Sequence, residues 1–332
     1  MTGSNRTTNA RALWLEPPMR ADLRVEELPE RRPDELRVRT LYSAVSRGTE
    51  TLVYAGRVPA SEYERMRAPF QSGTLPGPVK HGYANVGMVE AGPPEWLGRT
   101  VFCLYPHQTR YLVPVDAVVA LPEGIPAARA VLAANLETAI NATWDAAPRV
   151  GDRISVVGAG VVGCLVALLC AGVTGTDVQL VDVKHDRARI ARVLGARFAL
   201  PAEADCGRDL VFHASATSDG LNNALALAGH EAEVIEMSWF GTRSVTLDLG
   251  ARFHSERLAI RASQVGTVAP ARAARWGFHR RLALAVSLCA DARLDALFAP
   301  DAPFDTLPQV MARLADPADR TLCQRIDYSG EA

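Results

Sequence analysis

The chain has 332 residues, with 36 Lys or Arg and 37 Asp or Glu, and its formal net charge at pH 7 is −1. This length exceeds the roughly 250–300 residues at which a single hydrophobic core stops growing, so two domains are expected. A near-neutral chain has no long-range field to recruit nucleic acid or an anionic membrane, and the expected partner is a small molecule.

The N-terminal part of the chain has the pattern of short β-strands. The expected strands are Ala12–Leu15, Glu35–Ser46, Asn85–Gly92, Arg99–Tyr105, Arg110–Val115 and Ala117–Pro122. A stretch rich in Pro and Gly, Pro59–Gly82, interrupts them and contains one candidate short helix, SEYERMR. Several short strands separated by turn residues predict a barrel-like β domain.

The sequence pattern changes near Ala127, where the series of short strands ends. Ala127–Ala147 is rich in Ala and Leu, without internal Gly or Pro, and is typical of a helix. Strands and helices then alternate, with strands near Ile154–Gly158, Val178–Val183, Asp209–Ser215, Glu233–Gly241 and Leu258–Gly266 and helices near Val161–Ala171 and Asp219–Ala228. This alternation predicts a parallel sheet covered by helices on both faces. A long helix from Ala271 to about Cys289 and a strand Cys323–Tyr328 are expected to close the chain.

The cysteines and the N-terminal residues indicate the cellular compartment in which the protein is expected. Six cysteines are scattered without a C-x-x-C pair, which disfavours a disulfide framework or a closed zinc cage and fits a reducing cytoplasm. The opening residues MTGSNRTTNAR have no apolar signal-peptide region, and the longest apolar run is interrupted by glycines and falls short of the ~20 residues of a membrane span. We expect a soluble, unprocessed, cytoplasmic protein without a membrane partner.

A G-x-G-x-x-G hexapeptide follows the buried strand Ile154–Val157 and opens an apolar helix. Its residues are Gly158, Ala159, Gly160, Val161, Val162 and Gly163. The first glycine suits a tight turn, the second a close approach of backbone to a pyrophosphate, and the third the packing of helix on strand. The pattern predicts a dinucleotide site; the alternative is a glycine turn that binds no nucleotide.

Asp182 ends the next strand, 24 residues after Gly158. A carboxylate there accepts hydrogen bonds from the adenosine ribose and repels a 2′-phosphate, so NAD is favoured over NADP. Lys184 and Arg187 leave the opposite choice open, because a cation at this turn suits NADP. Val183, Lys184 and Ser215 complete the expected cofactor site.

Taken together, these segments resemble the medium-chain dehydrogenase/reductase superfamily of zinc alcohol, sorbitol and threonine dehydrogenases. The resemblance is carried by ARALWLE, SRGTE, GYANVGMVEAG, GRTVFCLYPHQTRYLVP, ANLETAINA, GDRISVVGAGVVG and LVDVKHDRARIARVLGA. The spellings SRGTE and GYANVG are nearest to the group of bacteriochlorophyllide a dehydrogenase and its relatives.

The resemblance implies an α/β chain of two domains. A GroES-like β-barrel catalytic domain is expected over 11–128 and 270–332, and a Rossmann domain with a doubly wound parallel sheet over 129–269. It also implies a homodimer formed through the edge of the Rossmann sheet, near Trp239–Gly266.

The family's zinc ligands are missing from this sequence. Aligning Gly48-Thr49-Glu50 with the family's Gly-Ser/Thr-Asp places Arg47 at the zinc cysteine, Tyr83 at the zinc histidine and Ala134 near the third ligand. An arginine is not deprotonated in proteins and an alanine has no donor atom, so no catalytic metal is expected. The four-cysteine structural zinc lobe is absent as well.

Without a metal, a hydrogen-bond donor must polarise the substrate oxygen. Tyr83 is the first candidate; the alternative is a packed tyrosine that only fills the metal's place. Thr49 matches the family's proton-relay hydroxyl, or else caps a helix. Glu50 is expected to pair with Arg47, whose guanidinium would bind a substrate anion; the alternative is a surface ion pair of little energy.

Two other chemistries are less favoured by the sequence. His107 and His254 are weaker acid/base candidates, because a lone loop histidine is usually structural or solvated. The sequence has no G-x-S-x-G elbow, which argues against Ser-His-Asp chemistry.

The predicted function is therefore a zinc-independent, NAD(H)-dependent oxidoreductase that interconverts an alcohol and a ketone or aldehyde on a small-molecule substrate. The alternatives are an NAD(P)H-dependent quinone or enoyl reductase and a non-catalytic NAD-binding protein.

Overall fold

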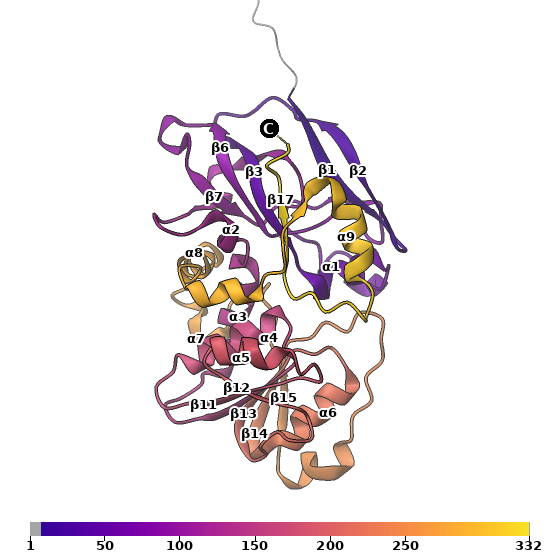
Figure 1. The fold of residues 1–332 in the computed structure, drawn as a ribbon, viewed down its shortest axis with the longest axis vertical. Helices are drawn as coiled ribbons and strands as arrows, with labels where there is room; N and C mark the ends of the chain where they lie inside the picture. Colours follow the sequence, from indigo (N-terminus) through magenta and orange to yellow (C-terminus); the bar gives the residue numbers. More distant parts are fainter. Residues whose placement is uncertain (1–7, 332) are drawn as a thin grey trace, which may run out of the picture. The chain divides into compact units, whose positions relative to one another are not determined.

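The computed structural model describes residues 8–331 (Figure 1); the segment 1–7, where a leader was not expected, lies outside the described residues. The chain divides into two compact units. Unit 1 comprises the residues up to Ala134, Val286–Ala290 and those from Phe298 onward, and unit 2 comprises Asn135–Ala285 and Asp291–Leu297.

These divisions differ from the predicted domain boundaries at 128/129 and 269/270. Residues 270–285 belong to unit 2, because Arg281 of helix α8 (Phe278–Leu288) is buried against helix α3 (Ala133–Ala146). Its guanidinium donates to Glu137 at 3.0 Å and to Asn141 at 2.5 Å.

Unit 1 contains two β-sheets. One has the order β2 (Arg20–Glu27), β1 (Asn9–Glu16), β5 (Val79–Lys80) and β4 (Ser72–Gly73). The other has the order β16 (Ala302–Pro303), β17 (Gln324–Asp327), β3 (Glu35–Val45), β6 (Asn85–Ala91), β7 (Thr100–Cys103) and β9 (Val118–Ala120), with β8 (Arg110–Pro114) also paired to β3. The alternating burial of β3 places Leu36 and Val38 in the barrel core. The expected β domain is confirmed; the polar strand β2 was not predicted.

Helices are short in unit 1. They are α1 (Arg47–Tyr54), α2 (Ala127–Ala130) and α9 (Leu307–Leu314), with 3₁₀ turns at Ala60–Glu62, Pro94–Trp96, Val115–Ala117 and Phe304–Thr306. SRGTE lies at the start of α1, and SEYERMR, expected as a short helix, forms only the first of these 3₁₀ turns. The single helix expected over 127–147 is divided into α2 and α3 by a turn at Val131 and Leu132.

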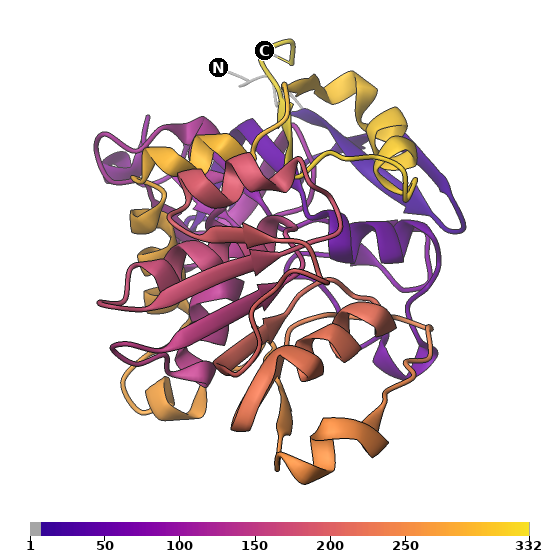
Figure 2. The ribbon, with the colours of Figure 1, turned by 60° about the horizontal axis from the view of Figure 1, so that its bottom comes forward.

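Unit 2 is built on a six-stranded parallel sheet. Its order is β12 (Arg197–Ala199), β11 (Asp177–Val181), β10 (Arg153–Val157), β13 (Arg208–His213), β14 (Ala228–Glu236) and β15 (Ala259–Ala262). Helices α4 (Val161–Ala171) and α5 (Arg187–Val193) cover one face and α6 (Ser218–Leu227) the other (Figure 2). The chain runs from β10 toward one edge and then from β13 toward the other, so these two strands flank the switch point at which doubly wound sheets bind ligands. The predicted Rossmann architecture is confirmed.

The remaining elements of unit 2 are α7 (Pro270–Ala273), a π-helical turn at Leu249–Phe253 and a 3₁₀ segment at Ala292–Leu297. The long helix expected from Ala271 to Cys289 is instead α7 and α8, separated at Gly277, a residue of low helix propensity. Within residues 8–331 no helix is long and apolar enough to cross a membrane.

Candidate active site and dinucleotide site

The glycine turn of unit 2 is shaped by the chain's own packing. Gly158 has φ +109°, and a Cβ added to it would lie 2.6 Å from the backbone nitrogen of Ser215. A Cβ on Gly163 would lie 1.9 Å from the carbonyl oxygen of Gly158. At Gly160 an added Cβ would meet no atom of the described chain within 4 Å. The first and third glycines therefore serve strand and helix packing, while the second leaves open backbone at the N-terminus of α4, where a phosphate is favoured.

Asp182 follows β11 and braces this turn. Its carboxylate accepts from the backbone nitrogens of Ala159 at 2.7 Å and Lys184 at 2.8 Å. A carboxylate has about four acceptor positions, so it retains capacity for ribose hydroxyls. Arg187, considered as a cation for a 2′-phosphate, is only 7% exposed.

The other expected cofactor residues surround the same turn. Val161 and Val162 are half-buried in the first turn of α4, Val183 is exposed, and Lys184 and Ser215 are half-buried. The structure thus brings the predicted cofactor residues together at the carboxyl ends of β10, β11 and β13.

In unit 1, Tyr83 lies between β5 and β6 and is half-buried. The side chains of Ser46 and Thr49, at the start of α1, lie near its hydroxyl and act to lower its pKa. Burial, and secondarily the charge of Glu50, raise the pKa of Tyr83 to about 12. Three of the predicted residues, Tyr83, Thr49 and Glu50, therefore lie together, and the phenol keeps its proton at neutral pH as a hydrogen-bond donor.

Glu50 begins a series of buried, hydrogen-bonded side chains that ends at Tyr328, next to the C-terminal strand β17. Its Oε1 accepts from the backbone nitrogen of Ser46 at 2.7 Å, and its Oε2 lies 2.9 Å from His107 Nε2. His107 Nδ1 lies 2.7 Å from Ser43 Oγ, which lies 3.0 Å from the Tyr328 hydroxyl. Glu50 is fully buried and His107 is 1% exposed, so their contact is shielded from water.

Arg47 does not take the role expected of it. It is the first residue of α1, and its guanidinium donates to the carbonyl oxygens of Leu314 at 2.9 Å and Asp316 at 2.8 Å, at the end of α9. It also approaches the carboxylate of Asp319 at 3.8 Å. The expected Arg47–Glu50 ion pair is wrong, because one helical turn carries Glu50 to the buried side of α1 while Arg47 extends to the C-terminal segment.

His81 is a buried neighbour of Tyr83 that the sequence offers as a possible nitrogen ligand for a metal, without a thiolate partner within reach. The two rings meet edge to face with centroids 6.0 Å apart. Burial lowers the pKa of His81 to about 4, so the imidazole is neutral. Its Nδ1 lies 3.1 Å from Gln71 Oε1, which also accepts from the backbone of Ala68. The hydrogen is therefore assigned to Nδ1, and none of residues 8–331 donates to His81 Nε2.

The donor atoms at the position of the family's metal do not suit zinc. The three aligned residues offer a guanidinium that is bound to backbone carbonyls, a phenol that keeps its proton because burial raises its pKa, and the methyl group of Ala134. Zinc sites use thiolate, imidazole or carboxylate ligands. In the part of the chain that the structure describes, no three His, Cys, Asp or Glu side chains are grouped to hold a metal ion.

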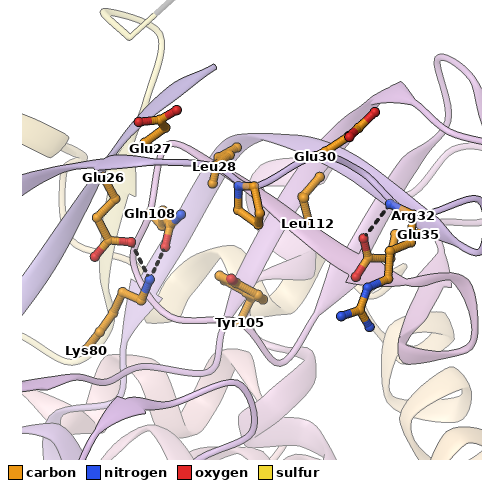
Figure 3. Close-up of a pocket in the computed structure, with 11 residues that line it drawn as sticks. Glu26, Glu27, Leu28, Glu30, Arg32, Glu35, Lys80, Tyr105, Gln108 and Leu112 are labelled. Carbon is orange, nitrogen blue, oxygen red and sulfur yellow. Dashed lines mark hydrogen bonds and ion pairs between the residues drawn. The ribbon is translucent and has the colours of Figure 1, made fainter. Parts of the chain in front are cut away.

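A separate cavity of about 390 Å³ lies in unit 1 between the end of β2, the start of β3 and the strand β8 (Figure 3). Lys80, only 5% exposed, lines it and donates to Glu26 at 2.6 Å and Gln108 at 2.7 Å. Tyr83, Thr49 and Glu50 are not among its lining residues. His254, the other histidine considered, is exposed in unit 2.

No protein-family model matches the chain, and no curated protein matches it. Solved structures do match along nearly its whole length. L-idonate 5-dehydrogenase from Escherichia coli K-12 superposes with a TM-score of 0.79 at 14% identity, covering 97% of this chain and 99% of the other. The short chain alcohol dehydrogenase rspB from E. coli CFT073, complexed with NADH, gives 0.75 at 14% identity, covering 97% and 100%. A thermostable alcohol dehydrogenase from Pyrobaculum aerophilum gives 0.75 at 19% identity, covering 97% and 100%. The chain therefore has the fold of these dehydrogenases, a GroES-like unit combined with a Rossmann unit.

Proposed function

We propose that the chain is a medium-chain oxidoreductase that uses NAD(H), without zinc, to interconvert an alcohol and a ketone or aldehyde on a small molecule. The observation that carries this proposal is the environment of Tyr83, a buried phenol whose pKa is raised to about 12 and whose hydroxyl has the side chains of Ser46 and Thr49 nearby, at the position where the resemblance places the metal. A neutral phenol at that position can donate to the oxygen of a carbonyl as negative charge develops on it.

The choice of NAD is supported by the surroundings of the ribose position. Asp182 presents a carboxylate at the end of β11, and the nearby Arg187 is buried. A 2′-phosphate would be repelled by the carboxylate and would find no exposed guanidinium from Arg187. The NADH complex of one structural neighbour is consistent with a nicotinamide cofactor in this fold.

In the proposed reaction the nicotinamide, when bound, supplies or accepts the hydride. Tyr83 donates its proton to the substrate oxygen, and the hydroxyls of Ser46 and Thr49 orient the phenol and return a proton to it. Glu50, fixed by His107 and by the backbone of Ser46, keeps negative charge behind the phenol and favours its protonated form.

The test is turnover by Tyr83→Phe, measured as NADH consumption over a panel of ketones, aldehydes and enones. Loss of a general acid lowers the rate by about 10²–10⁴-fold. Tyr105→Phe, in the separate cavity, is the matched control and is expected to keep the wild-type rate. Unchanged turnover by Tyr83→Phe would refute the phenol's role, and stoichiometric zinc in the purified protein would refute zinc independence. Activity restricted to enones would favour the enoyl reductase alternative, and NADH binding without any turnover the non-catalytic one.

The proposed protein is a cytoplasmic homodimer that pairs through the outer strand β15 of the parallel sheet, which ends the strand order in unit 2. An unpaired strand edge is a ready surface for a second copy. Light scattering of the wild type and of Ile260→Pro tests this, since proline within β15 removes a ladder donor and should shift a dimer to monomer.

A further inference from the structure

Unit 2 holds a serine, a histidine and a glutamate in hydrogen-bonded sequence at the carboxyl ends of two adjacent strands. His213 ends β13 and Glu236 ends β14. His213 Nδ1 lies 2.7 Å from Glu236 Oε2, and His213 Nε2 lies 2.7 Å from Ser215 Oγ. A nucleophile, a base and a carboxylate that orients the base, each within hydrogen-bond distance of the next, are the geometry by which a triad is recognised.

The hydrogen bonds assign the protons along this sequence. Glu236 Oε1 accepts from the backbone nitrogen of Ser238 at 2.6 Å, which fixes the carboxylate in place. Its Oε2 accepts the Nδ1–H of His213, so Nε2 carries the lone pair and accepts from the Ser215 hydroxyl. His213 is fully buried, whereas Ser215 is half-buried. The base is thus shielded from water and its nucleophile remains accessible.

Helix α6 begins beside the serine and leaves room for it. Thr217 caps the helix by accepting from the backbone nitrogen of Gly220 at 3.0 Å, and its hydroxyl lies 3.0 Å from Ser215 Oγ. A Cβ on Gly220 would lie 2.0 Å from Ser215 Oγ and 3.0 Å from His213 Nε2. Glycine in a helix costs about 1 kcal/mol relative to alanine, yet here only glycine lets the three polar side chains converge.

We propose that Ser215 is an activated nucleophile that accepts acyl groups from small carboxylic esters. Ser215 Oγ bonds to the ester carbonyl carbon as its proton passes to His213 Nε2. The bond from that carbon to the alkoxy oxygen breaks, and the departing alcohol takes the proton from His213. The amide of Ala216 donates to Ser238 Oγ at 3.1 Å and does not serve the carbonyl oxygen. The charge that develops on that oxygen would instead be stabilised by the positive N-terminus of α6, which begins at Ser218.

The nucleophile adjoins the glycine turn of the dinucleotide site. A Cβ on Gly158 would lie 2.6 Å from the backbone nitrogen of Ser215, so a dinucleotide on this turn covers the serine. The covering of Ser215 by a dinucleotide rests on the proposed function, whereas the reactivity of Ser215 in the cofactor-free protein does not.

The experiment treats the cofactor-free protein with a fluorophosphonate probe and locates the adduct by peptide mass spectrometry. Ser61 is the internal control, because it is an exposed serine whose hydroxyl meets a carboxylate, at 3.3 Å from Glu62 Oε1. We expect Ser215 to be labelled at least about 100-fold faster than Ser61, the range that a positioned base supplies. Equal rates at the two serines would overturn the proposal.

Three variants examine the mechanism of activation. Ser215→Ala should abolish the adduct, and His213→Gln should slow labelling by about 100-fold or more. Glu236→Gln keeps the shape but weakens the orientation of the base, so an intermediate rate is expected. Thermal unfolding of each variant shows whether unit 2 is folded; if His213→Gln is unfolded, the Glu236→Gln rate decides, and a wild-type rate there refutes the triad.

NADH provides the last comparison, with its binding measured separately by fluorescence. Protection of Ser215 by bound NADH supports the placement beside the cofactor, and labelling that proceeds at full rate on NADH-saturated protein overturns it. If NADH does not bind at all, the proposed function fails while the labelling of Ser215 still tests the nucleophile.

Discussion

The buried pair of Glu50 and His107 makes the sharpest stability prediction. His107→Leu removes the side-chain partner that Glu50 Oε2 has within residues 8–331, and the carboxylate keeps a backbone donor, from Ser46. Both side chains are at most 1% exposed, so water does not replace the lost partner. Leaving a buried polar group without its hydrogen-bond partner costs about 1–3 kcal/mol. For a domain of this size each kcal/mol lowers the Tm by about 2–4 °C, and the expected decrease is about 2–12 °C.

His107→Gln is the matched control. Its amide nitrogen can replace Nε2 toward Glu50 while losing only the contact of Nδ1 with Ser43, at 2.7 Å in the wild type. A loss of about 1 kcal/mol is expected from one hydrogen bond. Urea unfolding of the three proteins measures the differences. The reasoning is wrong if His107→Leu loses less than His107→Gln, or if adding Glu50→Gln to His107→Leu recovers no stability, since that second change removes the unpaired charge.

Two further predictions concern titration and the glycine turn. The pKa of His81 is near 4 in the folded protein and about 6.5 in the unfolded chain. The unfolded state therefore binds more protons between these values, and the free energy of unfolding should fall by about 3 kcal/mol as the pH decreases from 6.5 to 4. His81→Leu should show a shallower pH dependence, and equal slopes would contradict the assignment. Gly160→Ala should leave the Tm unchanged but weaken NADH binding, because its Cβ faces open space, whereas Gly163→Ala should lower the Tm through its contact with the carbonyl of Gly158. The opposite pattern in calorimetry and NADH titration would refute the roles given to the two glycines.

The fold was predictable where the determining signals are local. The hexapeptide at Gly158, the strand before it and the apolar helix after it lie within one βαβ unit, and the structure confirms this architecture. Prediction failed at breaks with weak local signals. The helix expected over 127–147 contains no Gly or Pro, yet it is divided at Val131 and Leu132. The helix expected from Ala271 to Cys289 is divided at Gly277.

The side-chain contacts in the candidate sites were even harder to predict from local sequence signals. Tyr83 was found because a resemblance fixed its position in the fold. The partner of Glu50 is 57 residues away, and nothing in the sequence around His107 indicates which carboxylate it meets. Glu50 was assigned to Arg47, its neighbour in sequence, because side-chain direction on α1 is not readable from the order of residues.

The sequence does not predict the arrangement at Ser215, because the absence of a G-x-S-x-G elbow argues against Ser-His-Asp chemistry in general and Ser215 is expected only as a cofactor residue. That motif describes one fold's way of presenting a serine, whereas here the serine and histidine come from the end of one strand and the glutamate from the next. The parallel pairing of β13 with β14 places His213 opposite Glu236 in register. Only this register, which the sequence does not state, brings the base to its carboxylate.

The electrostatics of Tyr83 favour one direction of the proposed reaction. Burial first, and the charge of Glu50 second, raise the pKa of the phenol to about 12, so the protonated form prevails over the whole neutral and mildly alkaline range. A protonated phenol serves carbonyl reduction as a donor, whereas alcohol oxidation needs an acceptor for the substrate proton.

We therefore expect reduction with NADH to keep a constant maximal rate up to about pH 10, the ordinary pKa of tyrosine, and oxidation with NAD to become faster as the pH rises. Measuring both directions across this range, with Tyr83→Phe as the control, checks the expectation. Glu50→Gln removes the second of the two effects that raise the pKa, so it should move the oxidation profile toward lower pH. A reduction rate that declines well below pH 10 in the wild type but not in Tyr83→Phe would show that the phenol loses its proton too early to act as the proposed donor.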